Sequence, residues 1–197
     1  MTTKITLVVS IMLSAVALGQ ETETVKVPAE VKRFVKDLSI PIALESADLN
    51  GDGRKDYILV LERANPEMDD DGFPINQRPL LILVRGQDGK LTEAKRNEKI
   101  VSCSECGGSQ GDPFQGFDVG PNTFTVKHSG GSGMRWSSHW IFNYSKADQT
   151  WRLVRSEVET FSSGDPEKVD KKVKRPEDFG KIDIADFDPK ILEEKPE

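Results

Sequence analysis

The fold is decided by the stretch Arg135-Trp136-Ser137-Ser138-His139-Trp140-Ile141-Phe142-Asn143-Tyr144. Successive side chains of a β-strand point to opposite faces of the sheet, so the even-numbered residues here, most of them aromatic, share one face. We expect that face to lie in the core, with Arg135 and His139 on the outward face. The stretch therefore predicts a long strand of a half-buried sheet.

Shorter stretches on either side have a similar amino-acid composition. They are rich in β-branched and aromatic residues, and they are separated by turn-forming clusters such as Gly86-Gln87-Asp88-Gly89 and Gly120-Pro121-Asn122. The predicted strands are 57–62, 79–85, 117–119, 123–128, 135–144 and 151–159. We therefore expect a mostly β (α+β) domain, built as a single antiparallel sheet or a sandwich.

The beginning of the chain has the features of a signal peptide. Lys4 precedes an apolar run, Ile5 to Leu18, which is short for a bilayer span but typical of a signal-peptide core. Small residues at Ala17 and Gly19 favour cleavage before Gln20. We therefore expect residues 1–19 to be removed and the product to be secreted or periplasmic, with no transmembrane segment after signal removal.

Two further segments flank the predicted strands. Apolar residues recur at helical spacing between Pro28 and Leu38, which predicts one N-terminal helix. After Ser162 the chain becomes charged, which is typical of a solvated tail, but apolar residues such as Phe187 interrupt it. We expect a β-rich domain over residues 20–162 and a partly docked tail over 163–197.

Composition limits the possible partners. The chain has 197 residues, 36% hydrophobic and 30% charged, with 27 Lys and Arg against 33 Asp and Glu and a net charge of -6. The mean hydropathy is -0.48 and the isoelectric point is near 5.1. Without a basic surplus the chain is poorly suited to neutralise phosphate backbones, so we expect no nucleic-acid partner.

The strongest chemical signal is the loop Asp48-Leu49-Asn50-Gly51-Asp52-Gly53-Arg54-Lys55-Asp56. It places side-chain oxygens at positions 1, 3, 5 and 9, a glycine at position 6, and the Arg54 carbonyl at position 7, which is the donor pattern of a Ca2+ loop. Position 12 is Leu59, where an EF-hand has Glu, and a strand follows. We therefore expect a weak structural Ca2+ site held by Asp48, Asn50, Asp52, Arg54 and Asp56. A metal-free turn is the alternative.

This loop resembles the calcium loops of FG-GAP (integrin alpha-type) repeats, whose Asp-x-Asn-x-Asp-Gly-x-x-Asp pattern also leads into an apolar strand. The resemblance covers about fifteen residues, from Asp48 onward. A β-propeller made of such repeats needs several blades. One motif does not supply them, so we do not expect a full propeller.

A wider set of features spans most of the chain after residue 20. It joins the helix and the Asp48 loop to Arg78-Pro79-Leu80-Leu81, Cys103 to Gly108, Gly111-Asp112-Pro113-Phe114, His128 with Gly130-Gly131-Ser132, and Arg135-Trp136. In this order the features resemble a group of small exported bacterial proteins whose function is uncharacterised. The resemblance implies export and a single domain but no substrate.

Cys103 and Cys106 form a Cys-x-x-Cys pair and are the only cysteines. In an oxidising compartment they are expected to form a disulfide that pins the turn before Gly107 and Gly108. A redox pair is an alternative, but the helix that follows such a pair in thioredoxin-like proteins is not predicted. Zinc is a third alternative, which would need His128 and His139 as further ligands.

Two other segments are candidate binding sites. Asp69-Asp70-Asp71-Gly72 is an acidic stretch of irregular spacing, for which we favour a metal-free loop over a second Ca2+ site. His128, Arg135 and His139, with the glycine-rich turn between them, are a possible ligand-binding group for an anion or a sugar. The alternative is an ordinary hairpin with a buried edge histidine.

We find no catalytic signature in the sequence: it has no Gly-x-Ser-x-Gly, His-Glu-x-x-His, P-loop or dinucleotide motif. We therefore expect a binding or envelope-associated role with a protein or glycan ligand, and no catalytic residues are assigned. The alternatives are a small calcium-stabilised hydrolase of envelope polymers, using paired carboxylates, and an inhibitor or immunity-type partner of another exported protein.

Overall fold

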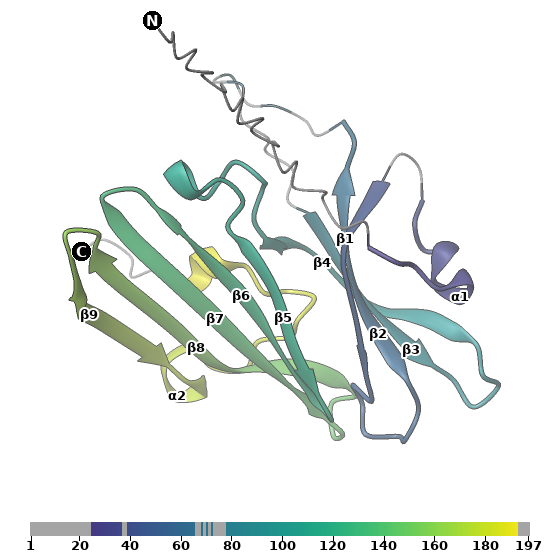
Figure 1. The fold of residues 1–197 in the computed structure, drawn as a ribbon. Coiled ribbons are helices and arrows are strands. Elements are labelled where there is room, and N and C mark those ends of the chain that lie inside the picture. Colours follow the sequence, from purple (N-terminus) through teal and green to yellow (C-terminus); the bar gives the residue numbers. More distant parts are fainter. Residues whose placement is uncertain are drawn as a thin grey trace, which may run out of the picture.

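The strands of the described chain form two antiparallel sheets in the computed structural model (Figure 1). The structure describes residues 25–36, 39–65, 68, 70, 72 and 78–192. One sheet has four strands in the order β1-β2-β3-β4, and the other has five in the order β5-β6-β7-β8-β9. Within each sheet, strands that are consecutive in sequence pair with each other. The predicted mostly β, sandwich-like fold is confirmed.

The four-stranded sheet is covered on both faces. Its strands are β1 (Ser39–Ala47), β2 (Asp56–Arg63), β3 (Arg78–Arg85) and β4 (Leu91–Val101). Ile58 and Val60 face the main core between the sheets, whereas Tyr57, Leu59 and Leu61 face a second apolar cluster with Val31. Burial on both faces explains why β2 is apolar at successive positions instead of alternating.

The five-stranded sheet has one face toward the main core. Its strands are β5 (Phe114–Gly120), β6 (Thr123–Gly131), β7 (Met134–Ser145), β8 (Thr150–Ser162) and β9 (Asp165–Lys174). Ser138, Trp140 and Phe142 of β7 are buried while Ser137, His139 and Ile141 are only partly buried. The predicted facing of this strand is therefore correct.

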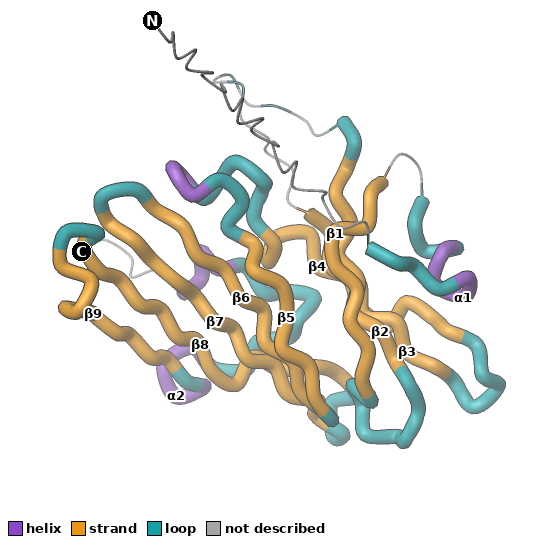
Figure 2. Tube along the Cα trace, viewed as in Figure 1, coloured by secondary structure: helices purple, strands orange, loops and turns teal. Residues whose placement is uncertain are grey.

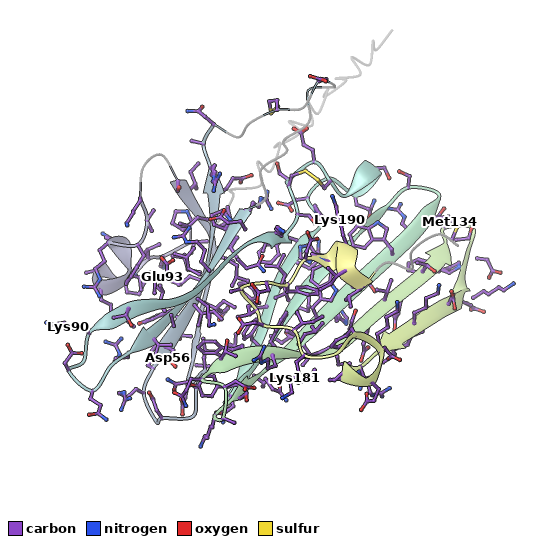
Figure 3. All side chains as sticks on the ribbon, turned by 180° about the vertical axis from the view of Figure 1, so that it is seen from behind. Asp56, Lys90, Glu93, Met134, Lys181 and Lys190 are labelled. Carbon is purple, nitrogen blue, oxygen red and sulfur yellow. A yellow bond between two sulfur atoms is a disulfide. The ribbon has the colours of Figure 1, made fainter. Side chains whose placement is uncertain are left out.

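A C-terminal segment completes the core between the sheets. It includes α2 (Pro176–Phe179) and the short 3-10 turn Pro189–Leu192. Ile184 and Phe187 are fully buried, and Asn97 of β4 donates its side-chain amide to the carbonyls of both, at 2.6 and 2.7 Å. Figure 3 shows this segment (yellow) passing between β4 and the five-stranded sheet. It fills the side of the sandwich away from β1 and β5.

The predicted helix over residues 28–38 is wrong in length. Helix α1 is only Ala29–Lys32, and Leu38 lies outside the described residues. The helix ends because Phe34 and Val35 donate their N–H groups to the carbonyls three residues earlier, which tightens the chain into a turn. The turn lets these apolar residues pack on the four-stranded sheet. Figure 2 shows how little of the described chain is helical.

Three strands, β1, β4 and β9, were not predicted. β4 is mostly polar, and β9 is exposed along nearly its whole length. β9 lies in the segment predicted as a tail, and its Lys171 contacts Glu157 and Glu159 of β8 at 2.9 and 2.8 Å. The sheet therefore continues past the predicted boundary at Ser162 to Lys174.

Candidate functional site

The turn between β1 and β2 contains the predicted calcium loop, Asp48 to Asp56. Gly51 and Gly53 have φ angles of 72° and 81°. Glycine adopts these left-handed values without the steric cost that a Cβ would bring. The two glycines thus let the chain reverse tightly enough to bring alternate polar side chains to the inside of the loop.

Side-chain oxygens of the loop accept hydrogen bonds from its own backbone. Asp48 accepts from the N–H groups of Asp52 and Gly53 at 3.0 and 2.9 Å, and Asn50 also accepts from Asp52 at 3.1 Å. Asp52 accepts from the N–H of Arg54 at 2.9 Å. Each carboxylate oxygen has two lone pairs, so the single N–H bond to each oxygen of Asp48 and to Oδ1 of Asp52 leaves one lone pair for a cation. Oδ2 of Asp52 instead accepts from both the Asn50 amide and the Arg54 guanidinium. The donors are gathered in one loop and are all hard oxygens, which suits Ca2+.

Asp56, the last predicted ligand, is fully buried with a relative exposure of 0%. Its two carboxylate oxygens accept the backbone N–H groups of Leu49 at 3.0 Å and Arg85 at 2.9 Å. Burial raises the pKa of Asp56, the two N–H bonds lower it, and the nearby Asp52 and Asp48 carboxylates raise it further. Within the described part of the chain, Asp56 has no ion pair. A buried carboxylate beside two others would be stabilised by a cation.

Arg54 supplies a positive charge to the loop. Its Nη2 lies 2.5 Å from Oδ2 of Asp52, and its Nε donates to the Arg85 carbonyl at 2.9 Å. Both side chains of this ion pair are partly exposed. Arg54 therefore offsets the negative charge of Asp52. It does not form an ion pair with Asp56 in the described structure.

The same loop joins the two sheets. The Asp48 carbonyl accepts the N–H of Asn122 at 2.9 Å, and the Leu49 carbonyl accepts the indole N–H of Trp151 at 2.8 Å. Asn122 lies in the β5–β6 turn and Trp151 in β8, both in the five-stranded sheet. The Leu49 side chain is fully buried in the main core. The loop is thus a junction between the sheets as well as a turn.

Asn122 also explains why position 51 is glycine. A Cβ on Gly51 would stand 2.2 Å from Oδ1 of Asn122, so no other side chain fits without displacement. That Oδ1 atom is buried without a hydrogen-bond partner in the described structure. The sequence marked Asn122 only as part of a turn. Its contact with the loop comes from a distant part of the chain and has no local signal.

No group of three or more His, Cys, Asp or Glu side chains is placed to hold a metal ion among the described residues. The three carboxylates of the calcium loop, Asp48, Asp52 and Asp56, are described and do not form such a group. The other two predicted donors are an amide, Asn50, and a main-chain carbonyl, Arg54. In the acidic stretch 69–72, Asp69 and Asp71 lie outside the described residues. Calcium therefore stays a prediction for the first loop.

His128 is separated from the two residues with which it was grouped as a possible ligand site. It is buried, 1% exposed, between the rings of Phe114 and Trp140, and its Nε2 accepts the N–H of Ser102 at 3.4 Å. Burial lowers its pKa to about 4, although the Asp112 carboxylate opposes this. His128 is therefore a neutral core residue at pH 7.

Arg135 and His139 lie on the outer face of the same sheet. His139 pairs with Lys127 on β6 and Glu157 on β8, and Arg135 donates to the Gly131 carbonyl at 3.3 Å. His128 pairs with Ser138, on the inward face. The structure thus brings Arg135 and His139 to one face and His128 to the other.

Arg78 is a second junction between the sheets, which the sequence did not identify. Its guanidinium is almost fully buried and contacts Glu62 at 3.0 Å and Asp112 at 2.8 Å. Burial lowers the pKa of Arg78, but the two carboxylates raise it by more, so the net shift is upward. Arg78 stays cationic and links β2 and β3 to the segment before β5.

The Cys103–Cys106 disulfide is present. The loop that follows docks on the end of β6, where Gly131 donates its N–H to the Gly107 carbonyl at 2.9 Å. Ser109 Oγ donates to the Gly131 carbonyl at 3.1 Å. The disulfide thus closes the turn that presents this loop to the glycine-rich hairpin.

The described part of the chain forms open grooves on its surface, and two of them are considered for ligand binding. One, of about 510 Å3, lies between β1 and β5 and is lined by Ile42, Leu44 and Glu45 on one side and by Gly116 and Phe117 on the other. The second, of about 710 Å3, lies at the β8–β9 hairpin.

Comparison with known proteins does not assign the chain to a family. No family model and no curated protein matches the chain. A solved structure described as a Xanthomonas type IV secretion system related protein is similar at a TM-score of 0.38 and 16% identity, over 72% of this chain and 57% of that one. The chain spans less than two thirds of that protein, and a likeness this weak carries no argument. None of the described helices is long and apolar enough to cross a membrane.

Proposed function

We propose that the chain is an exported binding domain whose two sheets are locked together by one Ca2+ in the Asp48–Asp56 loop. The observation that carries the calcium site is the buried Asp56 carboxylate, which has backbone N–H partners and two neighbouring carboxylates but no ion pair in the described structure. A divalent cation would offset this concentration of negative charge. Because the loop joins both sheets, the ion would stabilise their packing.

The donor set favours Ca2+ over other metals. Asp48, Asn50, Asp52 and Asp56 supply side-chain oxygens, and Arg54 supplies a carbonyl oxygen. Ca2+ accepts six to eight oxygens in flexible geometry, whereas Mg2+ requires a near-ideal octahedron and retains more water. Without a Glu at position 12, we expect weak affinity, of the kind that suits extracellular calcium concentrations.

The groove between β1 and β5 is the surface that we assign to ligand binding. Both strands are sheet edges in the described structure, and edges pair readily with an extended polypeptide. The calcium loop directly follows β1, and its Asp48 carbonyl bonds to Asn122 in the turn after β5. The proposed ion therefore fixes the spacing between the two walls of the groove. We infer that ligand binding depends on calcium and that the ligand is an extended peptide segment.

Thermal unfolding tests the calcium site. We expect Ca2+ to raise the unfolding midpoint relative to EDTA, with about 2.7 kcal/mol of added stability at about 100 times the dissociation constant. Mg2+ should have a much smaller effect. Asp52→Ala should abolish the response, and Asp118→Ala, outside the loop, should retain it. An unchanged midpoint in Ca2+ for the unaltered chain would refute the proposal.

Peptide selection tests the groove. A library of extended peptides is panned on the protein in Ca2+ and eluted with EDTA. For the selected peptides we expect Glu45→Lys, at the groove wall, to lower affinity about tenfold, equivalent to 1.4 kcal/mol. Glu105→Lys, an exposed residue of the disulfide loop, should have no effect. The groove would be excluded as the site if the peptides bound the Glu45→Lys variant as tightly as the unaltered protein, and bound the unaltered protein as tightly in EDTA as in Ca2+.

A further inference from the structure

The Cys103–Cys106 disulfide lies in the segment that joins the two sheets. Strand β4 ends at Val101 in the four-stranded sheet, and β5 begins at Phe114 in the five-stranded sheet. The two cysteines stand near the start of this connection, and Figure 3 shows their bond (yellow) in the loop before the 3-10 turn Gly108–Gln110. A chemical change at the disulfide therefore acts on the chain between the sheets.

The two cysteines differ in exposure. Cys103 is buried, 3% exposed, whereas Cys106 is an exposed residue. In thiol–disulfide exchange an attacking thiolate must reach one of the two sulfur atoms, so access decides which of them is attacked. An external thiol can therefore approach the disulfide at Cys106, while the rest of the protein shields Cys103.

The disulfide closes a short ring, which makes it a weak stabilising cross-link. The sequence separation of the two cysteines is only 3, and the stabilisation that a disulfide provides by restricting the unfolded chain grows with the length of the loop it closes. The turn also has a backbone hydrogen bond of its own, from the Cys106 N–H to the Cys103 carbonyl at 3.2 Å. This turn can therefore keep the two thiols close together after reduction, ready for reoxidation.

The loop after Cys106 packs against the β6–β7 hairpin through the backbone of glycines. Gly107 and Gly130 are both buried, and a Cβ on Gly130 would stand 3.0 Å from the Cα atom of Gly107. The Gly107 carbonyl accepts the N–H of Gly131 at 2.9 Å, and the Ser109 hydroxyl donates to the Gly131 carbonyl at 3.1 Å. Because Gly107 directly follows Cys106, the disulfide restricts the part of the chain that makes these contacts.

The surroundings of the pair suit an electron acceptor better than a catalyst of disulfide exchange. Catalytic Cys-x-x-Cys pairs lower the pKa of one thiol with a helix N-terminus or a neighbouring cation. Here a 3-10 turn of 3 residues, Gly108–Gln110, follows the pair in place of an α-helix. The exposed sulfur is accessible to a reductant without being activated as a nucleophile.

We propose that Cys103–Cys106 is a reversible redox switch, reduced by a dithiol, that sets how tightly residues 107–111 dock on the β6–β7 hairpin. A thiolate of the dithiol bonds to Sγ of Cys106, and the Cys103–Cys106 bond breaks, with its electron pair and a proton going to Sγ of Cys103. The second thiol of the reductant then attacks the reductant's own sulfur in the mixed disulfide. Cys106 leaves and takes up a proton, and the reductant departs as a disulfide.

This switch is independent of the proposed calcium site. The calcium loop bonds to Asn122, which precedes β6, whereas the disulfide loop docks on Gly131, the last residue of β6. The two sites thus act at opposite ends of the same strand. Loss of the calcium response would leave the redox switch in place, and loss of the switch would leave the calcium response.

Native-state reduction tests the exchange. The folded chain is treated with dithiothreitol, alkylated with iodoacetamide and analysed by peptide mass spectrometry, while the unfolding midpoint confirms that the reduced chain is folded. We expect the disulfide to be reduced without denaturant, and Cys106 to be alkylated at least about tenfold faster than Cys103 because Cys103 is buried. Glutathione disulfide should restore the bond. Reduction only in urea, or equal alkylation rates of the two cysteines, would refute the proposal.

Hydrogen exchange at the Gly131 N–H tests the effect on the hairpin. We expect this N–H to exchange at least about tenfold faster in the reduced chain, because its acceptor, the Gly107 carbonyl, is then less restrained. The double variant Cys103→Ser/Cys106→Ser should match the reduced chain. The N–H groups of Phe124 and Val126, at the other end of β6, are internal controls for an intact sheet. Exchange at Gly131 that is the same in the oxidised and reduced chains would overturn the switch.

Discussion

Asp56 supports the sheet junction by accepting two backbone N–H groups that would otherwise be buried without partners. One comes from Leu49 at the start of the loop, and the other comes from Arg85 at the end of β3. A carboxylate can satisfy two donors at once, whereas an amide presents one oxygen and one NH2 group. The residue therefore has a structural role whether or not a cation is bound.

We expect Asp56→Asn to lower the free energy of unfolding by about 1–3 kcal/mol in EDTA, because the new NH2 group faces a buried N–H donor. The variant should also lose the calcium response. Urea unfolding measures both effects. Asp88→Asn, in the exposed β3–β4 turn, is the matched control and should change stability by less than about 0.5 kcal/mol. Equal effects of the two substitutions would show that Asp56 has no such role.

His128 should make stability depend on pH. Its pKa is about 4 in the folded protein and about 6.5 in an unfolded chain. Between these values the unfolded state binds a proton that the folded state does not, so stability is full above pH 6.5 and falls as the pH drops toward 4. The loss is on the order of 3 kcal/mol.

The comparison of the unaltered chain with His128→Gln isolates this effect. Glutamine retains a side-chain acceptor for the Ser102 N–H but does not titrate. We expect the stability difference between the two proteins to shift against the unaltered chain as the pH is lowered from 7 to 4. Urea unfolding at several pH values measures it. A difference that is constant with pH would show that His128 titrates normally.

At the scale of elements, the segment 182–187, after β9, fills space in the main core between the sheets, and we call it the wedge. Phe187 is fully buried and packs edge-on against Trp140 and Phe142, with ring centroids 5.4 and 5.5 Å away. Asp183 adds polar contacts, accepting from Thr150 at 2.7 Å and pairing with Lys95 at 3.2 Å. The wedge therefore contacts both sheets.

We expect Phe187→Ala to lower the free energy of unfolding by about 3–5 kcal/mol, the usual cost of removing a buried aromatic ring. Ile191→Ala, a few residues further along the same segment but at a position 52% exposed, should change it by less than about 0.5 kcal/mol. Urea unfolding of both variants measures the contrast. If both substitutions changed the free energy of unfolding by similarly small amounts, the segment would not be part of the core.

The sequence predicted β2, β3 and β5 to β8, because their side chains carry a continuous or alternating apolar pattern, and it missed β1, β4 and β9. β4 and β9 carry no such pattern: their residues are mostly polar, and they form strands because a neighbour offers a hydrogen-bonding edge. The helix was overestimated because apolar spacing does not distinguish a helix from a turn that also reaches the sheet. These errors all concern elements whose conformation depends on tertiary contacts.

At the scale of the whole molecule, the candidate loop was recognisable because its proposed ligands are consecutive in sequence. Its connections to the other sheet were not, since Leu49 and Trp151 are 102 residues apart. The structure also separates His128, on the inward face of the sheet, from Arg135 and His139 on the outer face. Nearness in sequence along a hairpin does not place side chains on the same face of the sheet.

The coupling of the sheets through the loop predicts a calcium effect far from the ion. We expect EDTA to accelerate hydrogen exchange at the Trp151 indole N–H, because its acceptor is the Leu49 carbonyl of the loop. Proton NMR follows this signal, and Trp151→Phe assigns it. The indole signals of Trp136 and Trp140 are internal controls. Exchange at Trp151 that is the same with and without Ca2+ would show that the loop and β8 are not coupled.

The wedge also constrains the order in which the protein can fold. All nine described strands precede Ile182, Ile184 and Phe187 in the chain, so both sheets are synthesised before the residues that fill the space between them. Until those residues arrive, Trp140 and Phe142 have no partner on that side and the sandwich stays open. We therefore expect the two sheets to pack fully against each other only after synthesis has passed residue 187. For an exported protein, as we propose this one to be, such a delay would keep the chain unfolded for longer before it is exported.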